Sequence, residues 1–376
     1  MLSLRTCVDI HANRIEDARR RRLLPGYATC TRYRHENSNL RNIFLDMPVP
    51  FSRIARGESL LERLVVISIR YQLWDVFTDA PLTGNQLAVI PEGDRIPPQL
   101  MQRIANEFSL PETSFLLSAT SRDSNCRFRI FTPQRELPMA GHPTIGSTFA
   151  LARLKRIQPG ATAISVELGI GPTSVDLVWR KDRLESAWMA QNAPEFGPVC
   201  QDAESLGRTL GLDSSRIANL AAPAQILSSG VPLLFVCLTS RADVDRVALN
   251  RAALTQCLER MGVEECPVYV FSLEPADDGA LTYSRMFAPV FGIEEDPATG
   301  GASGPLFAYV RTYYPNAVTA SGPFLNRQGV KLGRPSEIYM RPSPSGEEAL
   351  AAPLGARIGG HAVFVGEGTL SVQAKA

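Results

Sequence analysis

A short pattern that occurs once in each half of the 376-residue chain constrains the fold more than any other sequence feature. Residues 131–133 (FTP) precede 141–146 (GHPTIG) and an apolar run, and residues 287–289 (FAP) precede 295–300 (EDPATG) and another apolar run. Each copy predicts a strand, a tight loop and a helix opened by proline. A match this short also arises by coincidence; we interpret it as two pseudo-repeated lobes, residues 70–191 and 192–376.

Strand patterns recur from Tyr71 onward, and helical patterns are fewer. The expected strands are Tyr71–Phe77, Gln86–Ile90, Ser114–Thr120, Cys126–Thr132, Ile164–Leu168, Ser174–Trp179, Ser186–Gln191, Ala224–Leu238, Val268–Leu273, Leu281–Phe287, Glu337–Arg341 and Ala362–Val372. The expected helices are Pro98–Phe108, Pro143–Leu154, Ala203–Leu212, Arg251–Met261 and Pro297–Tyr314. Many strands with one long helix in each half predict an α+β protein whose sheets wrap around helices.

Residues 1–69 differ from the rest, with 12 arginines against 7 acidic residues and no sustained period. A basic arm that binds nucleic acid is one interpretation, and the acidic residues argue against a transit peptide. We favour a disordered extension or an overlong gene start.

Composition excludes several partners and cofactors. The net charge of +1 predicts no nucleic-acid or membrane partner, and no apolar run reaches the roughly 20 residues of a membrane span. Seven widely spaced cysteines without a zinc pattern indicate a reducing, cytoplasmic location. Phosphate-loop, dinucleotide and histidine-metal motifs are missing from the sequence, so we expect no cofactor. Proton transfer is the main chemistry that side chains perform alone.

The two predicted helix starts are candidate anion sites. Asp296 stands before Pro297 where an N-cap belongs, and His142 holds the equivalent place before Pro143. Small residues that follow Pro297 leave backbone amides open, so two facing helix starts would suit a small carboxylate. Simpler alternatives remain: Asp296 as a plain cap, glycines for packing, and His142 as a structural histidine.

Glu112 is the candidate for proton transfer. It lies between a predicted helix end and a strand start, close to the apolar Leu110 and Phe115. Desolvation would raise its pKa from the usual value of about 4.3 toward the range that an acid catalyst needs. Local sequence alone favours the alternative of an exposed surface glutamate.

Five motifs in order resemble the PhzF-like family of phenazine biosynthesis. They are residues 77–89 (FTDAPLTGNQLAV), 110–113 (LPET), 131–138 with 140–144 (AGHPT), 295–300 (EDPATG) and 333–336 (GRPS). The resemblance covers roughly Tyr71 to Val372. It implies a diaminopimelate-epimerase-like fold: two pseudo-symmetric lobes, each a curled β-sheet around a central α-helix.

The resemblance also implies a cofactor-independent isomerase, a homodimer that shifts a proton on a small carboxylate such as 2,3-dihydro-3-hydroxyanthranilate. Glu112 would be the general acid and base. The residues that would bind substrate are Gly141, His142, Asp296, Thr299, Gly300 and Gly301.

Two departures leave the substrate open. Gly301 stands where a serine is common in the family, and Met139 replaces the more usual aromatic residue. The cysteine pair of the related epimerases is missing from both helix starts, which argues against two-thiol epimerisation. A non-catalytic carboxylate-binding or regulatory protein on the same fold is the alternative function.

Overall fold

The structure is a computed structural model, and it describes residues 64–217, 222–318, 322–343 and 355–375. Residues Ile67–Val372 form one compact unit. The extension predicted for residues 1–69 lies outside the described residues up to residue 63, and strand β1 begins at Leu64.

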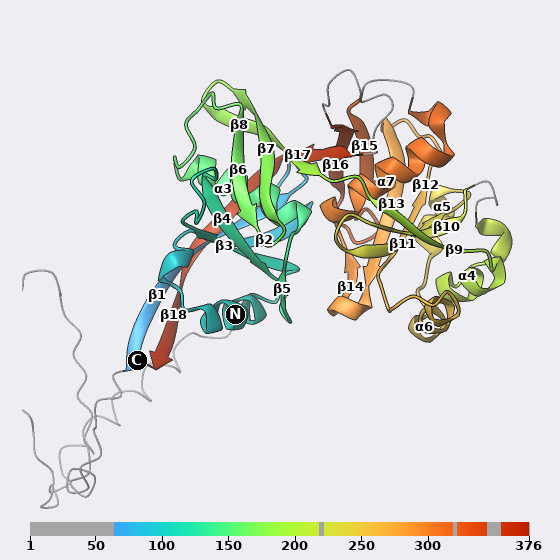
Figure 1. The fold of residues 1–376 in the computed structure, drawn as a ribbon, viewed down its shortest axis with the longest axis horizontal. Helices are drawn as coiled ribbons and strands as arrows, with labels where there is room; N and C mark the ends of the chain where they lie inside the picture. The colour runs from blue at the N-terminus through green and yellow to red at the C-terminus, as the bar shows by residue number, and fades with distance from the viewer. Residues whose placement is uncertain (1–63, 218–221, 319–321, 344–354, 376) are drawn as a thin grey trace, which may run out of the picture. The chain divides into compact units, whose positions relative to one another are not determined.

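The described residues combine one hydrogen-bonded sheet with a smaller number of helices (Figure 1). The strands are β1 (Leu64–Val76), β2 (Asn85–Ile90), β3 (Glu112–Leu117), β4 (Cys126–Phe131), β5 (Glu136–Leu137), β6 (Ala163–Leu168), β7 (Gly171–Arg180), β8 (Arg183–Gln191), β9 (Glu195–Cys200), β10 (Ala224–Ser228), β11 (Pro232–Cys237), β12 (Val268–Ser272), β13 (Ala280–Ala288), β14 (Ile293–Asp296), β15 (Phe324–Gln328), β16 (Ser336–Pro342), β17 (Ala356–Gly360) and β18 (Ala362–Lys375). The helices are α2 (Pro98–Phe108), α3 (Gly141–Arg153), α4 (Ala203–Leu210), α5 (Arg241–Arg246), α6 (Arg251–Arg260) and α7 (Gly300–Tyr313), with 3-10 turns η3 (Gly93–Arg95), η4 (Ser214–Arg216), η5 (Pro289–Phe291) and η6 (Pro315–Ala317).

The sheet is mixed, which confirms the predicted α+β class. Strands β2 and β3 pair in parallel, as do β11 and β12, whereas most other neighbours are antiparallel. The predicted strand Ala224–Leu238 is two antiparallel strands, β10 and β11, because Gly230 turns the chain between them at φ +127°.

Helices α3 and α7 lie in the hydrophobic core. Every residue of α3 from Gly141 to Leu151 is buried, and so is nearly all of α7 from Gly300 to Val310. A helix that is apolar on all sides needs neighbours on all sides. Helix α3 therefore packs against β2, β3 and β8, and α7 packs against β10, β16 and β17. In Figure 1, each of the two helices lies among these strands.

The helix starts differ from the predicted ones. Helix α7 begins at Gly300, so Pro297 lies outside it, and Asp296 is the last residue of β14. The N-cap prediction for Asp296 and His142 is wrong: Thr299 and Ala140 occupy those positions, and neither caps with its side chain. The physical reason is that the Asp296 carboxylate accepts hydrogen bonds from Asn85 and Thr299 instead of from helix amides.

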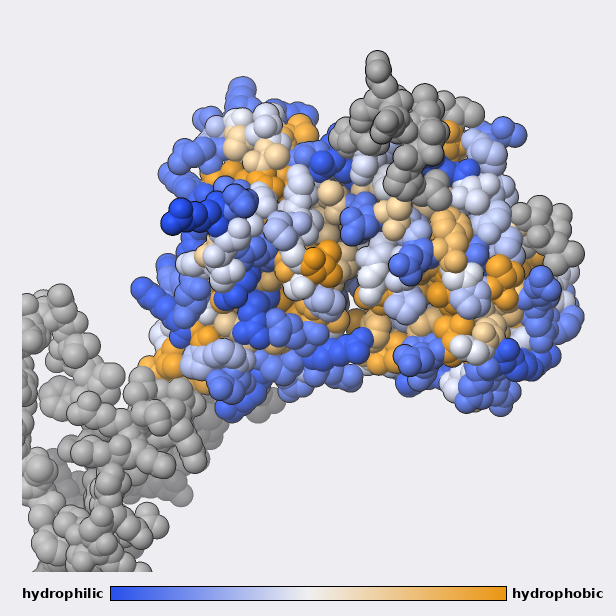
Figure 2. Space-filling view, in the orientation of Figure 1, coloured by the Kyte–Doolittle hydropathy of each residue, from blue (hydrophilic) through white to orange (hydrophobic). Residues whose placement is uncertain are grey.

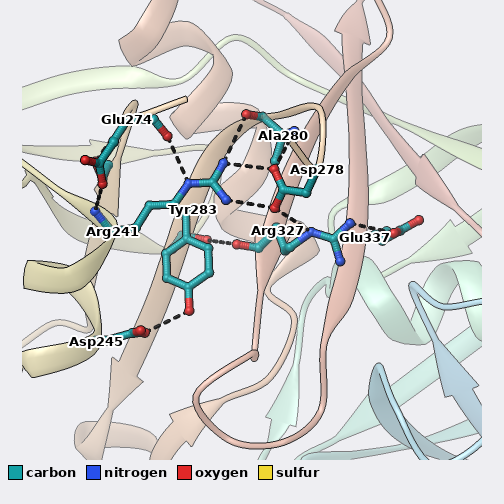
Figure 3. Close-up of polar contacts among 10 residues, drawn as sticks. Arg241, Asp245, Glu274, Asp278, Ala280, Tyr283, Arg327 and Glu337 are labelled. Atoms are coloured by element: carbon teal, nitrogen blue, oxygen red, sulfur yellow. Dashed lines mark hydrogen bonds and ion pairs between the residues drawn. The ribbon is translucent and has the colours of Figure 1, made fainter. Parts of the chain in front are cut away.

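A charged network joins α5 to strands β15 and β16 (Figure 3). Arg241 donates two hydrogen bonds to Asp278, which also pairs with Arg327, and Arg327 in turn pairs with Glu337. These guanidinium contacts, those of Arg241 foremost, lower the pKa of Asp278 to about 2. The network fixes β15 at Arg327. The residue after Arg327 is Gln328, which is buried and donates a hydrogen bond to the Asp296 carbonyl.

The visible surface intersperses hydrophilic and hydrophobic residues (Figure 2). None of the helices in the described part of the chain has the length and apolarity that a bilayer crossing requires.

Candidate active site

One cavity brings together every residue that the sequence proposed for the site. Its lining includes Glu112, Gly141, His142, Asp296, Thr299, Gly300 and Gly301. These residues come from segments far apart in the chain: the first residue of β3, the first turn of α3, the end of β14 and the first turn of α7.

The starts of α3 and α7 touch at a pair of glycines. A Cβ atom added to Gly141 would lie 2.6 Å from the Cα of Gly300, and one added to Gly300 would lie 3.0 Å from the Cα of Gly141. Neither position accepts a side chain while the backbones stay this close. The first amides of a helix lack partners within that helix, so two sets of N–H groups and two positive dipole ends converge on the cavity. This arrangement is suited to bind a carboxylate.

Glu112 and His142 form a buried pair in the cavity wall. Oε2 of Glu112 lies 3.1 Å from Nε2 of His142, and the two side chains are only 12% and 4% exposed. Neither atom has a well-aligned hydrogen-bond partner among the described residues. The alternative of an exposed surface glutamate is therefore wrong.

Burial sets the protonation of this pair. Loss of hydration raises the pKa of Glu112 well above its usual value, and the nearby Asp296 carboxylate raises it further. The same loss of hydration lowers the pKa of His142 to about 3, against the opposing effect of a hydrogen bond with the Gln86 backbone. Burial therefore favours the protonated carboxyl group of Glu112 and the neutral imidazole of His142.

Asn85 connects His142 to Asp296, and the sequence reasoning missed it as a site residue. Its Nδ2 donates to Oδ1 of Asp296 at 2.7 Å and to the Ala298 carbonyl at 2.9 Å, and it lies 3.1 Å from Nδ1 of His142. Asn85 is fully buried. The sequence did contain a signal for Asn85, because this polar residue lies in the 77–89 motif and directly precedes the apolar strand predicted at Gln86–Ile90.

Asp296 is the second carboxyl group of the site. Its Oδ2 accepts a 2.6 Å hydrogen bond from Oγ1 of Thr299. Burial raises the pKa of Asp296 to about 6, although the hydrogen bonds from Thr299 and Asn85 oppose that rise. Two further residues that were not predicted hold the segment between β14 and α7 in place. Gln328 donates to the Asp296 carbonyl, and Gln191 donates to the Gly300 carbonyl.

Thiols and metal ligands are not gathered here. The described cysteines, Cys126, Cys200, Cys237, Cys257 and Cys266, are buried free thiols outside the cavity lining. Across the described ranges, no three His, Cys, Asp or Glu residues are grouped so that they could hold a metal ion.

The cavity thus places a buried carboxyl group with a raised pKa beside two converging helix starts. Such an arrangement can bind an anion at the helix starts and transfer a proton at the carboxyl group.

Comparison with known proteins finds relatives in sequence and in structure. The family model of PhzC-PhzF, described as phenazine biosynthesis-like protein, matches residues 74–368. An uncharacterised isomerase of Mesorhizobium japonicum is 32% identical over 80% of this chain and 98% of its own length. A trans-2,3-dihydro-3-hydroxyanthranilate isomerase of Pseudomonas fluorescens is 31% identical over the same shares of both chains. The crystal structure of a PhzF-family protein of Bacillus anthracis superimposes with a TM-score of 0.72 at 26% identity, and the match covers 81% of this chain and all of that one.

Proposed function

The chain belongs to the PhzC-PhzF family of phenazine biosynthesis-like proteins, and from this premise we propose that it isomerises a small unsaturated carboxylate by proton transfer at Glu112. The family membership confirms the resemblance seen in the sequence, and the named relatives support an isomerase. The observation that supports the role of Glu112 is its burial beside His142 at two converging helix starts, where its pKa is raised.

The proposed reaction is a proton shift between two carbons of the substrate. The substrate carboxylate lies against the first amides of α3 and α7. Glu112 gives its proton to one carbon of the substrate, and a C–H bond at another carbon then returns a proton to the same carboxylate. A double bond moves, and the enzyme regains its starting state without an added cofactor. His142 and Asp296 orient the substrate, and Thr299, Gly300 and Gly301 complete the binding surface.

Trans-2,3-dihydro-3-hydroxyanthranilate, the substrate in the name of the Pseudomonas relatives, is the first compound to test. Solvent-deuterium incorporation by NMR is the direct assay, on this compound and on a panel of cyclic unsaturated carboxylic acids. We expect deuterium at a carbon position with the wild type and not with Glu112→Gln. Exchange that persists in the variant would remove Glu112 from the mechanism, and binding without exchange would favour the non-catalytic carboxylate-binding protein.

We further propose that residues 70–191 and 192–376 form two similar lobes, each a curled sheet around a central helix. The glycine starts of α3 and α7 and the strands around each helix support this. A homodimer is the expected assembly, and sedimentation velocity of the full chain tests it.

A further inference from the structure

Besides the helix starts, the cavity is lined by a set of apolar side chains, here termed its apolar end. Leu137, Met139, Val231, Leu233, Phe291 and Ile293 are among the residues that line it. They come from β5, the approach to α3, the start of β11, η5 and β14, so several segments present hydrophobic groups to one space. The described lining contains no lysine or arginine.

The hydroxyl groups of the lining are already engaged. Oγ1 of Thr132 donates to the Arg135 carbonyl, and Oγ of Ser229 donates to the Asn192 carbonyl. Oγ1 of Thr299 donates to Asp296. Each hydroxyl has a single proton, so none of the three has a free donor left for a ligand.

Among the fully buried side-chain nitrogen and oxygen atoms of the described lining, those without a hydrogen-bond partner are Oε2 of Glu112 and Nε2 of His142, and they lie by the helix starts. The cavity therefore has two kinds of lining: polar side chains and amides at the helix starts, and hydrophobic side chains in the apolar end.

We propose that the substrate is a monocarboxylate whose skeleton away from the carboxylate is hydrophobic, with no second carboxylate, carbonyl or amide at that end. The inference rests on the proposed function, since it assumes that the carboxylate binds at the helix starts. A polar group in the apolar end would give up its water without gaining a donor. The expected result is binding weaker by roughly 5- to 100-fold than that of an apolar isostere.

Gly301 leaves room in the cavity wall at the start of α7. A Cβ atom added there would meet no atom within 4 Å, so the start of α7 leaves open space in the cavity wall. A branched or cyclic hydrophobic skeleton suits that space better than a linear one.

Binding of stable aromatic carboxylates to the full chain tests the proposal. Isothermal titration would compare 3- and 4-isopropylbenzoate with 3- and 4-carbamoylbenzoate, which have the same number of heavy atoms. We expect the better isopropyl isomer to bind at least 5-fold more tightly than either amide. Equal or tighter binding of an amide would overturn the proposal, and so would failure of all four compounds to bind.

Two isosteric variants locate the effect. Val231→Thr places a hydroxyl in the apolar end and should reduce the isopropyl preference several-fold. Val178→Thr is the matched control on β7, where Val178 is 41% exposed and outside the cavity lining, and it should keep the wild-type preference. An unchanged preference in Val231→Thr would contradict the assignment of this wall. A protein that shows Glu112-dependent deuterium exchange without the binding preference would keep the proposed function and lose only this inference.

Discussion

Oε2 of Glu112 and Nε2 of His142 lie 3.1 Å apart in the cavity wall. Burial favours the neutral form of both groups, because it raises the pKa of Glu112 and lowers the pKa of His142 to about 3. A carboxylic acid held in this way can give up a proton and take one back, which is the property that an isomerase without a cofactor needs.

Glu112→Gln should abolish turnover and leave the fold intact. The amide has the shape of the protonated acid but no proton to transfer, so we expect the deuterium-exchange rate to fall by at least about 100-fold. Exchange is measured by NMR in deuterated buffer. Circular dichroism should match the wild type, and an exchange rate within a few-fold of it would refute the assignment.

The same variant should reveal the cost of ionising Glu112. A raised pKa in the folded state means that the folded protein holds the proton more tightly than the unfolded chain. Glu112 therefore lowers stability as pH rises above its usual pKa of 4.5, whereas glutamine does not titrate. Thermal unfolding at pH 8 should find Glu112→Gln at least as stable as the wild type, with a difference that narrows toward pH 4.5. If the stability of Glu112→Gln relative to the wild type were lower at pH 8 than at pH 4.5, the raised pKa of Glu112 would be contradicted.

Gly141→Ala should separate the two helix starts. The new Cβ would lie 2.6 Å from Gly300 Cα and 2.7 Å from Gly301 N, and backbone cannot rotate away as a side chain can. Overpacking of this kind costs about 1–3 kcal/mol of unfolding free energy, partly offset by the better helix propensity of alanine. Urea unfolding and the exchange assay measure both effects, and we expect activity to fall at least about 100-fold.

Gly301→Ala is the control for that variant. Its Cβ enters open space, so the unfolding free energy should stay within about 0.5 kcal/mol of the wild type or rise. Equal stability and activity in the Gly141 and Gly301 variants would show that the close approach is not required.

The sequence predicted which residues line the cavity better than it predicted the helix starts. The order of the motifs identified Glu112, His142 and Asp296 as residues of one site, because each of them lies in a short motif that can be recognised from its own sequence. The helix register was wrong because Pro297 reads as a first helical residue, whereas the Asp296 carboxylate is held by Asn85, 211 positions earlier. Such long-range partners leave no local signal.

Short strands were missed for a related reason. Strands β5 and β14 have two and four residues, and their pairing with β4 and β13 decides their conformation more than their own composition does. Gln191 and Gln328 likewise look like ordinary polar residues of strands until the structure shows their amides at the start of α7.

Asp278→Asn should weaken the charged network on β15. The carboxylate accepts from both terminal nitrogens of Arg241 and from the Ala280 amide, and the asparagine removes the charge that these bonds rely on. We expect a loss of about 1–2 kcal/mol in unfolding free energy at pH 7.

The loss has a defined pH dependence. A pKa lowered from 3.8 to about 2 stabilises the folded state above pH 3.8, and this contribution disappears as pH falls through 2. Urea unfolding across that range measures it. The exposed neighbour variant Asp277→Asn is the control and should match the wild type throughout; an equal loss in both variants would rule out the network as the cause.

Asn85→Ala should move the pH dependence of catalysis. Asn85 is a positioning residue: its amide lowers the pKa of Asp296, which burial raises to about 6, and it lies beside the imidazole of His142. Without the amide, Asp296 takes up its proton at higher pH. The acid limb of the pH–rate profile should therefore shift above pH 6, with a rate at pH 7 that is about 10- to 100-fold lower.

Gln225→Ala distinguishes this effect from a general loss of stability. Gln225 is also a buried amide with two side-chain hydrogen bonds, to the Gly197 carbonyl and from Tyr313, but it lies outside the cavity lining. Both variants should lose about 1–3 kcal/mol of unfolding free energy, and only Asn85→Ala should shift the acid limb. If the profile keeps its wild-type midpoint in Asn85→Ala, then Asn85 supports the fold alone, and the link from His142 to Asp296 has no part in setting the protonation of the site.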